Sequence, residues 1–233
     1  MEVRSNKKIN WEELTVKDRE NIPKATIERL PLYYRCLDKI DTFEDVEVVS
    51  SKDLGGKLDI PSTQVRKDLS YYGEFGRRGV GYNVNELKRS VGKILGVDRV
   101  WPAILVGAGN LGRALVNYKS FAMMGFEISH VLDNDLDKIG NVINDREVKS
   151  AQEMEKVVQE NDIKLGVIAV PTEAAQEVAE QMIDAGIKAI WNFAPTRLYV
   201  PDEIEVKNED LAVGIVSLIY HLSWQEEMEE TGE

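Results

Sequence analysis

Apolar residues in the front third of the chain recur at helical spacing. In the segment IPKATIERLPLYYRCLDKI they stand three or four positions apart, at Ile27, Leu30, Tyr34 and Leu37. This period predicts an amphipathic helix. Because proline has no amide donor, Pro31 should lie near the start of this helix or kink it.

Two short helices separated by the break DIP are expected next. Ser51 can cap the first, which should run through Leu58. Ser62 can cap the second, which should run to about Tyr72 and stop at Gly73. One face of the second helix is apolar and carries Val65, Leu69 and Tyr72.

The stretch EFGRRGVGYNV predicts two short extended pieces around a glycine-rich, doubly basic turn. Helix, turn, helix and basic hairpin in this order are the layout of a winged helix. The following segment, VNELKRSVGKILG, predicts one more helix, which ends at Gly96. We therefore place a winged-helix domain at 22–96, after a polar extension at 1–21.

From residue 101 apolar runs alternate with helical stretches. PAILVG, FEISHVLD, IKLGVIAV and KAIWNFA suit buried strands, and LGRALVNYKSFAMMG, SAQEMEKVVQEN and TEAAQEVAEQMIDAG are expected to be helical. This alternation predicts an α/β domain at 97–209, a Rossmann-like doubly wound parallel sheet.

The segment 211–224, LAVGIVSLIYHLSW, has no charge and is apolar on nearly every face. It is shorter than the ~20 residues that span a bilayer. Because a helix that is apolar all round is buried on all sides, we expect a homodimer that exchanges a C-terminal helix. The helix and its acidic tail occupy 210–233. Packing of this helix within its own domain is the alternative.

Charge changes this picture locally. The net charge of the chain is −12, but residues 50–93 hold nine basic and five acidic residues. A basic patch on an acidic protein is drawn to phosphate. The first residues contain no apolar signal core and Cys36 is the single cysteine, so we expect a cytoplasmic protein with no membrane segment.

The sequence GAGNLG joins a predicted strand to a predicted helix. Gly107 would make the tight turn, Gly109 would let a pyrophosphate approach the backbone, and Gly112 would let the helix pack closely. Amide groups at the start of the helix favour an anion there. The residues of this predicted phosphate loop are Gly107, Ala108, Gly109, Asn110, Leu111 and Gly112.

Asp133 ends the next predicted strand, 21 residues after Gly112. An acid at this place accepts hydrogen bonds from the adenosine ribose and repels a 2′-phosphate, which favours NAD+ and NADH. Two later strand ends are candidates for lining the nicotinamide site. Their residues are Val170, Pro171 and Thr172, and Asn192, Phe193 and Ala194. Capping of its own helix is an equal alternative for Thr172.

A dehydrogenase needs a proton donor or acceptor beside the nicotinamide. Both histidines, His130 in a strand and His221 in the terminal helix, are interpreted as interior residues. No cluster of cysteine and histidine suits zinc. We therefore expect a protein that senses the nucleotide, with no metal and no catalytic activity.

The second helix of the winged helix and its basic turn offer polar groups to DNA. Glutamine can pair with adenine, and arginine and lysine reach guanine or phosphate. Arg77 and Arg78 suit phosphate or a narrow A/T-rich minor groove. An ordinary solvated charge face is the alternative. The helix candidates are Ser62, Thr63, Gln64, Arg66, Lys67, Ser70 and Tyr71.

The segments IPKATIERLPLYYRCL, QVRKDLSYYGEFGRRGVGY, ILVGAGNLGRALVNY and WNFAP resemble the Rex family of bacterial redox-sensing repressors, over about residues 22–228. The resemblance implies a homodimer with winged helices, Rossmann domains and swapped terminal helices. It implies binding to A/T-rich palindromic operators of fermentation and respiration genes, and release by NADH but not by NAD+. By position, the reading helix is Ser62–Tyr71, the phosphate loop Gly107–Gly112 and the ribose acid Asp133.

A physical basis for such a switch is the positive charge of oxidised nicotinamide, which a dry apolar pocket penalises. Leu211 can supply the apolar wall. Arg35, Tyr118 and Asp210 are our candidates for charge pairs that re-sort between states. Two other functions stay open: an NAD-dependent oxidoreductase with an accessory DNA-binding domain, and a protein-binding module in which the nucleotide is structural.

Overall fold

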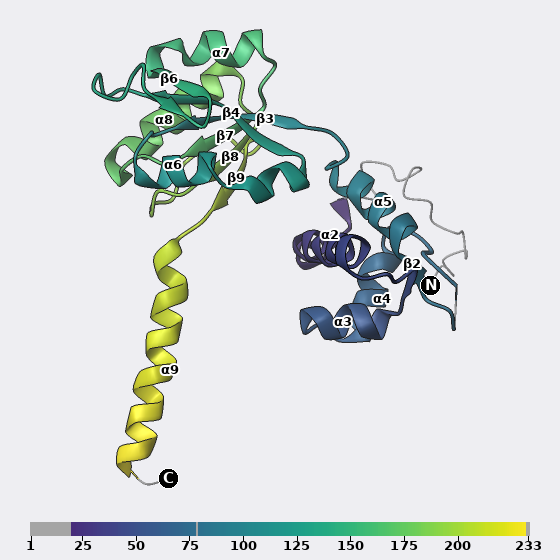
Figure 1. The fold of residues 1–233 in the computed structure, drawn as a ribbon. Helices are drawn as coiled ribbons and strands as arrows, with labels where there is room; N and C mark the ends of the chain where they lie inside the picture. Colours follow the sequence, from purple (N-terminus) through teal and green to yellow (C-terminus); the bar gives the residue numbers. More distant parts are fainter. Residues whose placement is uncertain (1–19, 78, 232–233) are drawn as a thin grey trace, which may run out of the picture. The chain divides into compact units, whose positions relative to one another are not determined.

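The computed structural model describes residues 20–77 and 79–231 and divides into two compact units between Arg99 and Val100 (Figure 1). Most of the predicted extension at 1–21 therefore lies outside the described residues. Arg78 of the predicted basic turn also lies outside them.

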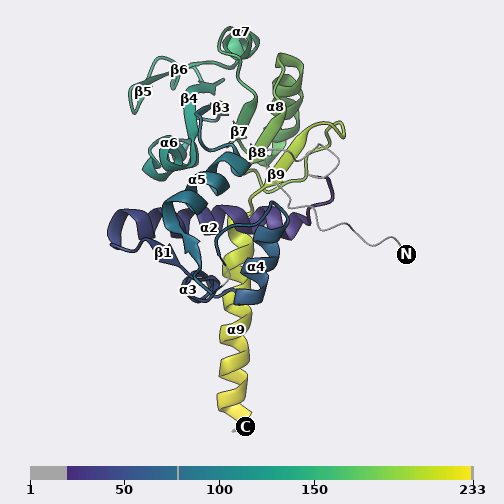
Figure 2. The same cartoon turned by 90° about the vertical axis from the view of Figure 1, so that its right-hand side faces the viewer.

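The first unit is a small helical domain with a two-stranded sheet (Figure 2). The strands β1 and β2 pair antiparallel, with Val49 opposite Tyr82. Its helices enclose one core that includes Leu30, Tyr33 and Val65, none more than 1 % exposed. The elements are α2 (Lys24–Phe43), β1 (Val48–Val49), α3 (Ser51–Leu58), α4 (Ser62–Ser70), β2 (Tyr82–Asn83) and α5 (Val84–Leu95).

Local details of this unit differ from the sequence-based prediction. The helix α2 continues through Pro31, which is its eighth residue, and Ile27 on its predicted apolar face is exposed. The cap of α3 is Ser50, whose hydroxyl accepts from the Asp53 amide, so the prediction for Ser51 was wrong by one residue.

The helix α4 has Pro61 at its cap position and ends at Ser70, short of the predicted end. Ser62 is its first helical residue and does not cap it, because a cap side chain must precede the first turn. The predicted wing strands are mostly replaced by a tight turn, in which Arg77 and Gly81 form an isolated bridge.

The second unit is a seven-stranded sheet in the order β5-β6-β4-β3-β7-β8-β9. All neighbours pair parallel except β5 and β6. The chain reverses its direction of progress between β3 and β7, which is the switch point where doubly wound sheets bind ligands. The strands are β3 (Trp101–Val106), β4 (Phe126–Asp133), β5 (Val142–Ile143), β6 (Arg146–Ser150), β7 (Leu165–Ile168), β8 (Ala189–Asn192) and β9 (Glu205–Asn208).

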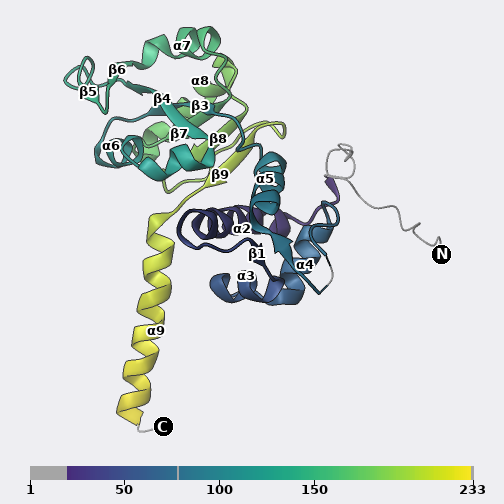
Figure 3. The same ribbon diagram turned by 45° about the vertical axis from the view of Figure 1, so that its right-hand side comes forward.

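Helices cover both faces of this sheet (Figure 3). Alternate residues of β3 point to opposite faces. Ile104 and Val106 pack with α7 (Met154–Glu160) and α8 (Thr172–Ala185). Leu105 packs with residues of α6 (Asn110–Val116) and of the 3-10 helix η2 (Lys119–Met124). The short 3-10 helix η3 (Ala151–Glu153) precedes α7.

One long helix was predicted over LGRALVNYKSFAMMG, but the structure has α6 and η2 with a break at Tyr118. Asn117 ends α6 because its side chain donates to the Arg113 carbonyl. The break lets Tyr118 and Phe121 stack edge to face, with ring centroids 4.8 Å apart. Aromatic packing has thus overridden the helical period.

The terminal helix α9 (Leu211–Thr231) is longer than the predicted 14 residues and takes in most of the acidic tail. All its side chains from Leu211 to Met228 are exposed in the single chain. They include ten large apolar side chains, nine between Leu211 and Trp224 and the tenth at Met228, each at least 38 % exposed. No helix in the described ranges is long and apolar enough to cross a bilayer.

Candidate cofactor cleft and DNA-reading surface

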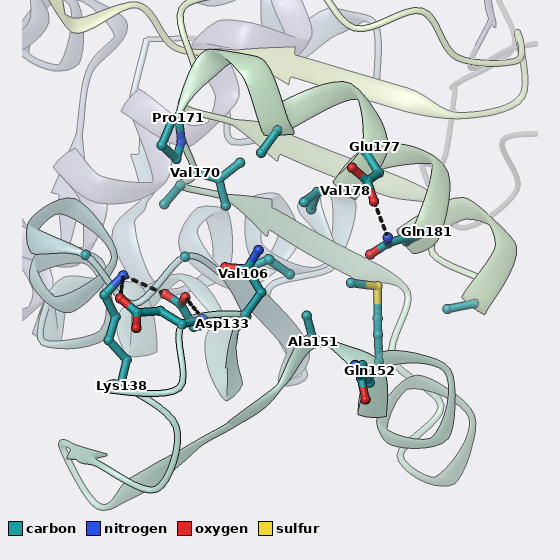
Figure 4. A pocket seen from close by; sticks show the side chains of 18 of the residues that line it. Val106, Asp133, Lys138, Ala151, Gln152, Val170, Pro171, Glu177, Val178 and Gln181 are labelled. Atoms are coloured by element: carbon teal, nitrogen blue, oxygen red, sulfur yellow. Dashed lines mark hydrogen bonds and ion pairs between the residues drawn. The ribbon is translucent and has the colours of Figure 1, made fainter.

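A cleft of about 1010 Å³ opens at the carboxyl ends of β3, β4 and β7, at the switch point of the sheet (Figure 4). Its size is at the upper end of the range of ligand pockets. One wall comes from the loop after β3, another from the loop after β4, and a third from α8. The cleft lining includes Gly107, Gly109, Asp133, Lys138, Val170 and Pro171.

Two loop glycines are required by the protein itself. Gly107 has φ +109°, and a Cβ there would lie 2.4 Å from the Ala169 carbonyl oxygen. A Cβ on Gly112 would collide with the Gly107 carbonyl. Gly107 thus lets the turn lie close to the residue that follows β7, and Gly112 lets α6 pack closely on the turn.

Gly109 is different, because its φ is −75° and nothing lies within 4 Å of a Cβ built on it. The fold therefore does not require glycine there. Gly109 is the N-cap residue of α6 and lines the cleft. Because it has no side chain, it forms no side-chain capping hydrogen bond. The open space over this residue fits a group that approaches the backbone closely, as a pyrophosphate does.

Asp133 is buried at the end of β4 and faces the cleft (Figure 4). Its carboxylate accepts hydrogen bonds from the amides of Ala108 at 2.8 Å and Asp135 at 2.9 Å. Lys138 Nζ lies 3.2 Å from the same carboxylate. Burial raises the pKa of Asp133, but these hydrogen bonds outweigh burial and the net pKa is lowered. The acid is therefore ionised and its orientation is fixed.

Lys138 was missed by sequence reasoning. It lines the cleft and pairs with both Asp133 and Asp135 at 3.2 Å. Its position five residues after the strand-end acid is not a motif, so only the folded loop reveals the pairing.

The residues predicted for the nicotinamide site are divided in the structure. Val170 and Pro171 line the cleft, whereas Thr172 is the first residue of α8. Asn192 is buried and holds the next turn, since its Nδ2 donates to the carbonyls of Ala194 at 3.1 Å and Thr196 at 2.9 Å. Phe193, Ala194 and Leu211 also lie outside the lining of this cleft. Their contact with a cofactor stays a prediction.

The predicted DNA surface is exposed at most of its positions. Thr63, Arg66, Lys67 and Ser70 on α4 are exposed, whereas Val65, Leu69 and Tyr72 are buried as predicted. Ser62, Gln64 and Tyr71 are half-buried at the edges of this face, and Arg77 on the turn is exposed. The two faces of α4 therefore separate by polarity, as a reading helix requires.

A buried carboxylate behind this helix was not predicted. Asp68 is fully buried and accepts hydrogen bonds from Thr26, Arg29, Tyr33 and Gln64. Burial raises its pKa, but the hydrogen bonds outweigh it and lower the pKa to about 2. Arg29 lies on α2 and donates hydrogen bonds from Nε and Nη2 to the two carboxylate oxygens of Asp68 on α4. The network therefore fixes α4 against α2.

We expect Asp68→Ala to destabilise the first unit by about 3 kcal/mol, because it leaves buried donors and the Arg29 cation without their partner. Hydrogen–deuterium exchange of α2 and α4 in the full chain measures this loss. Asp45→Ala, at an exposed acid, should change the same exchange by less than about 0.5 kcal/mol.

The lowered pKa also fixes the sign of a pH effect. The contribution of Asp68 is fully present above its ordinary pKa of about 4, and is lost as the pH falls towards about 2. A carboxyl shifted by this much contributes about 2 kcal/mol. Unchanged acid sensitivity in Asp68→Ala would contradict the assignment.

Neither histidine forms a catalytic arrangement. His130 is half-buried with Nδ1 3.0 Å from the Ser129 hydroxyl, and burial lowers its pKa. His221 is exposed on α9, so within a single chain the prediction of an interior position is not met. Among the described residues, no group of three or more His, Cys, Asp or Glu side chains suits a metal ion.

The three candidate switch residues lie on separate elements and are all exposed. Arg35 is on α2, Tyr118 precedes η2, and Asp210 precedes α9, where its carboxylate accepts from the Ala212 amide at 2.8 Å. Their proposed pairing stays a prediction.

Known proteins resemble the chain over nearly its whole length. The family model described as "CoA binding domain" matches residues 98–196, and the one described as "Putative DNA-binding protein N-terminus" matches residues 21–70. The redox-sensing transcriptional repressor Rex of Desulforamulus reducens is 49 % identical over 88 % of this chain and 97 % of its own. Rex 1 of Thermotoga maritima is 47 % identical over 87 % and 97 %.

Solved structures agree with these relatives. A Rex-family repressor, RSP, in complex with NAD+ and operator DNA matches with a TM-score of 0.83 and 38 % identity, over 91 % of this chain and 98 % of that one. The same repressor with NADH matches with a TM-score of 0.80 and 36 % identity, over 91 % and 99 %. The expected fold, a winged helix followed by a Rossmann-like sheet, is confirmed. The chain belongs to the Rex family of redox-sensing transcriptional repressors.

Proposed function

We propose that this chain is a repressor that binds an A/T-rich palindromic operator as a homodimer and leaves it when NADH binds. The observation that carries the proposal is the open space over Gly109, at the switch point of the sheet. The fold itself does not require glycine at this position, so the space is available to a ligand. The basic, exposed face of α4 on an acidic chain supports the DNA-binding part.

The cleft favours NAD+ and NADH over related nucleotides. The adenosine of coenzyme A carries a 3′-phosphate and that of NADP a 2′-phosphate. The ionised Asp133 would repel either group and would accept hydrogen bonds from an unmodified ribose. The ammonium group of Lys138 neutralises part of the Asp133 charge. The preference for NAD+ and NADH over phosphorylated nucleotides therefore depends on the strength of this ion pair.

The terminal helix supports the dimer. A monomer rarely exposes a large contiguous apolar surface, and α9 exposes apolar side chains on every face. We infer that it is exchanged with a second copy of the chain, and that Leu211 contributes an apolar wall beside the nicotinamide. A dry wall disfavours the charged oxidised ring, which gives NADH the stronger effect.

Sensing, and not turnover, is the proposed role of the nucleotide in the cytoplasm. The relatives are named as repressors, and neither histidine lies on the cleft lining. An oxidoreductase would consume NADH in the presence of a small carbonyl substrate, whereas we expect the absorbance of NADH at 340 nm to stay constant.

A titration tests the proposal. NADH and then NAD+ are added to the protein bound to a labelled A/T-rich palindrome, and release is followed by fluorescence anisotropy. We expect NADH to release the duplex and NAD+ to leave it bound. Equal release by both nucleotides would overturn the proposed redox response.

Arg66→Ala is the control that separates the two units. We expect weaker operator binding, with a reduced salt dependence and an unchanged affinity for NADH, because Arg66 is exposed on α4 and remote in sequence from the cleft. Loss of both affinities would contradict independent sites.

We further propose that Asp210 takes part in the switch with Arg35 and Tyr118. Asp210→Ala should reduce the release caused by NADH while leaving NADH binding within about twofold. A coupling of about 1–3 kcal/mol corresponds to a change of about 5–150-fold in operator affinity. The measurement is operator affinity at zero and saturating NADH, and an unchanged ratio would remove Asp210 from the switch.

A further inference from the structure

We propose that Asp68 holds the side-chain amide of Gln64 so that Gln64 reads an exocyclic base amine in the major groove. The inference rests on the proposed DNA binding and names the chemistry that one residue of the reading helix recognises. Gln64 is the contacting residue, and Asp68 is a positioning residue that never reaches the DNA.

The Asp68 carboxylate is surrounded by hydrogen-bond donors. Its side chain is fully buried and collects donors from Thr26, Arg29 and Tyr33 on α2. The distances from its oxygens to these donors lie between 2.6 and 2.9 Å. An ionised carboxylate only accepts hydrogen bonds. Any partner of Asp68 must therefore turn a donor towards it.

The side-chain amide of Gln64 is oriented by Asp68. Its Nε2 donates to Asp68 Oδ1 at 2.7 Å, one helical turn away. The two ends of a glutamine amide are decided by their hydrogen-bond partners, and an acceptor-only partner permits one orientation. Oε1 therefore points away from the buried carboxylate. One N–H of Gln64 is committed to Asp68, and a second N–H stays beside Oε1.

Gln64 lies in the first turn of α4. It is the third residue of α4, and the first turn of a recognition helix is the part that reaches base edges. Its side chain is half-buried, next to the exposed side chains of Thr63 and Lys67. A half-buried amide with a fixed orientation loses little rotamer freedom on binding, so its hydrogen bonds contribute to selectivity.

The major-groove edge of adenine matches the oriented amide of Gln64 best. In the major groove the exocyclic amines of adenine and cytosine are donors, whereas guanine O6 and thymine O4 are acceptors. The outward Oε1 attracts the two amines and is repelled by the two carbonyls. The remaining N–H of Gln64 matches N7 of adenine, so adenine satisfies both groups and is the expected partner.

The experiment uses the full chain and a labelled palindrome that this chain enriches from a random-sequence duplex pool. Each adenine of a half-site is replaced in turn by purine deoxyriboside, which lacks the N6 amine. Wild type should lose about 10-fold in affinity at one position per half-site, within the range for a base contact. Gln64→Met should bind the unmodified duplex more weakly and lose less than about twofold at that same position.

Lys67→Met is the matched control. It removes a cation from the same exposed face and should weaken binding to every duplex, yet keep the 10-fold loss at the position that Gln64 reads. This control also accounts for the weaker base pair that purine forms. If Gln64→Met keeps the full loss at every adenine, or if wild type has no sensitive position, the inference is wrong.

The role of Asp68 has a separate readout that needs no change to the buried network. In the wild type, the side-chain NH2 protons of Gln64, assigned by their absence in Gln64→Met, should exchange with water at least about 10-fold more slowly than those of the exposed Gln152. Equal exchange rates would overturn the positioning role.

Failure of the proposed function is distinguishable from failure of this inference. If the chain enriches no sequence from the pool, the DNA-binding function itself fails. If it enriches a palindrome that Gln64→Met reads with the same base preference, DNA binding stands and only the reading by Gln64 fails.

Discussion

Gly109→Val is expected to abolish the response to NADH while leaving the protein folded. The backbone at residue 109 is extended, with φ −75° and ψ −168°, and nothing lies within 4 Å of the new Cβ. The fold therefore accepts the side chain, at a cost of about 1 kcal/mol for the changed helix cap. The same side chain fills the space that a pyrophosphate needs.

The expected loss of affinity for NADH and NAD+ is at least about 100-fold, which corresponds to about 3 kcal/mol. Isothermal titration calorimetry measures it. The variant should still bind the operator, because its winged helix is untouched, and should stay bound at the NADH concentrations that release the wild type. Release by NADH at wild-type concentrations would contradict the assignment of the cleft.

Gly107→Ala is the matched comparison, two residues away in the same loop. Its φ of +109° and the 2.4 Å approach of a Cβ to the Ala169 carbonyl oxygen make this glycine structural. We expect a loss of stability of about 2 kcal/mol or more in the second unit. Gly109→Val should thus lose binding with a fall of only a few degrees in melting temperature, and Gly107→Ala should lose more stability.

Periodic and glycine patterns predicted the larger features correctly. The loop from Gly107 to Gly112 and the acid Asp133 were found because their spacing follows from how a strand, a turn and a helix meet. The doubly wound parallel sheet was predicted likewise, since alternating apolar runs and helical stretches permit few topologies. Patterns of this kind depend on backbone geometry, which is local in sequence.

The missed features depend on side-chain contacts that no periodic or glycine pattern encodes. Nothing in RKDLS distinguishes Asp68 as a buried acid, and only its contacts with α2, which include Thr26, 42 residues earlier, show it to be buried. Lys138 pairs with Asp133 through a loop fold that no spacing rule gives. The cap of α3 was misplaced by one residue because two serines adjoin and either hydroxyl suits the role.

Ile219→Glu is expected to convert the proposed homodimer into monomers. The residue is 53 % exposed in the single chain, in the middle of an uncharged stretch of α9. If α9 is exchanged between subunits, the new carboxylate is buried at the apolar interface, and burial of an unpaired charge costs several kcal/mol. Light scattering at micromolar concentration should give the mass of one chain.

The loss of the dimer should weaken operator binding by at least about 100-fold, because each half-site then binds without the effective concentration that a linked partner supplies. Glu226→Gln is the control on the same helix, at an exposed acid of the tail, and should leave the mass and the affinity unchanged. The oligomeric mass decides between the two interpretations of α9. A monomeric Ile219→Glu means that the helix packs on a partner, and its melting temperature should fall as well, because dissociation removes the stabilisation that the partner supplies. A lowered melting temperature in a dimer that persists would instead place the helix in the core of its own chain.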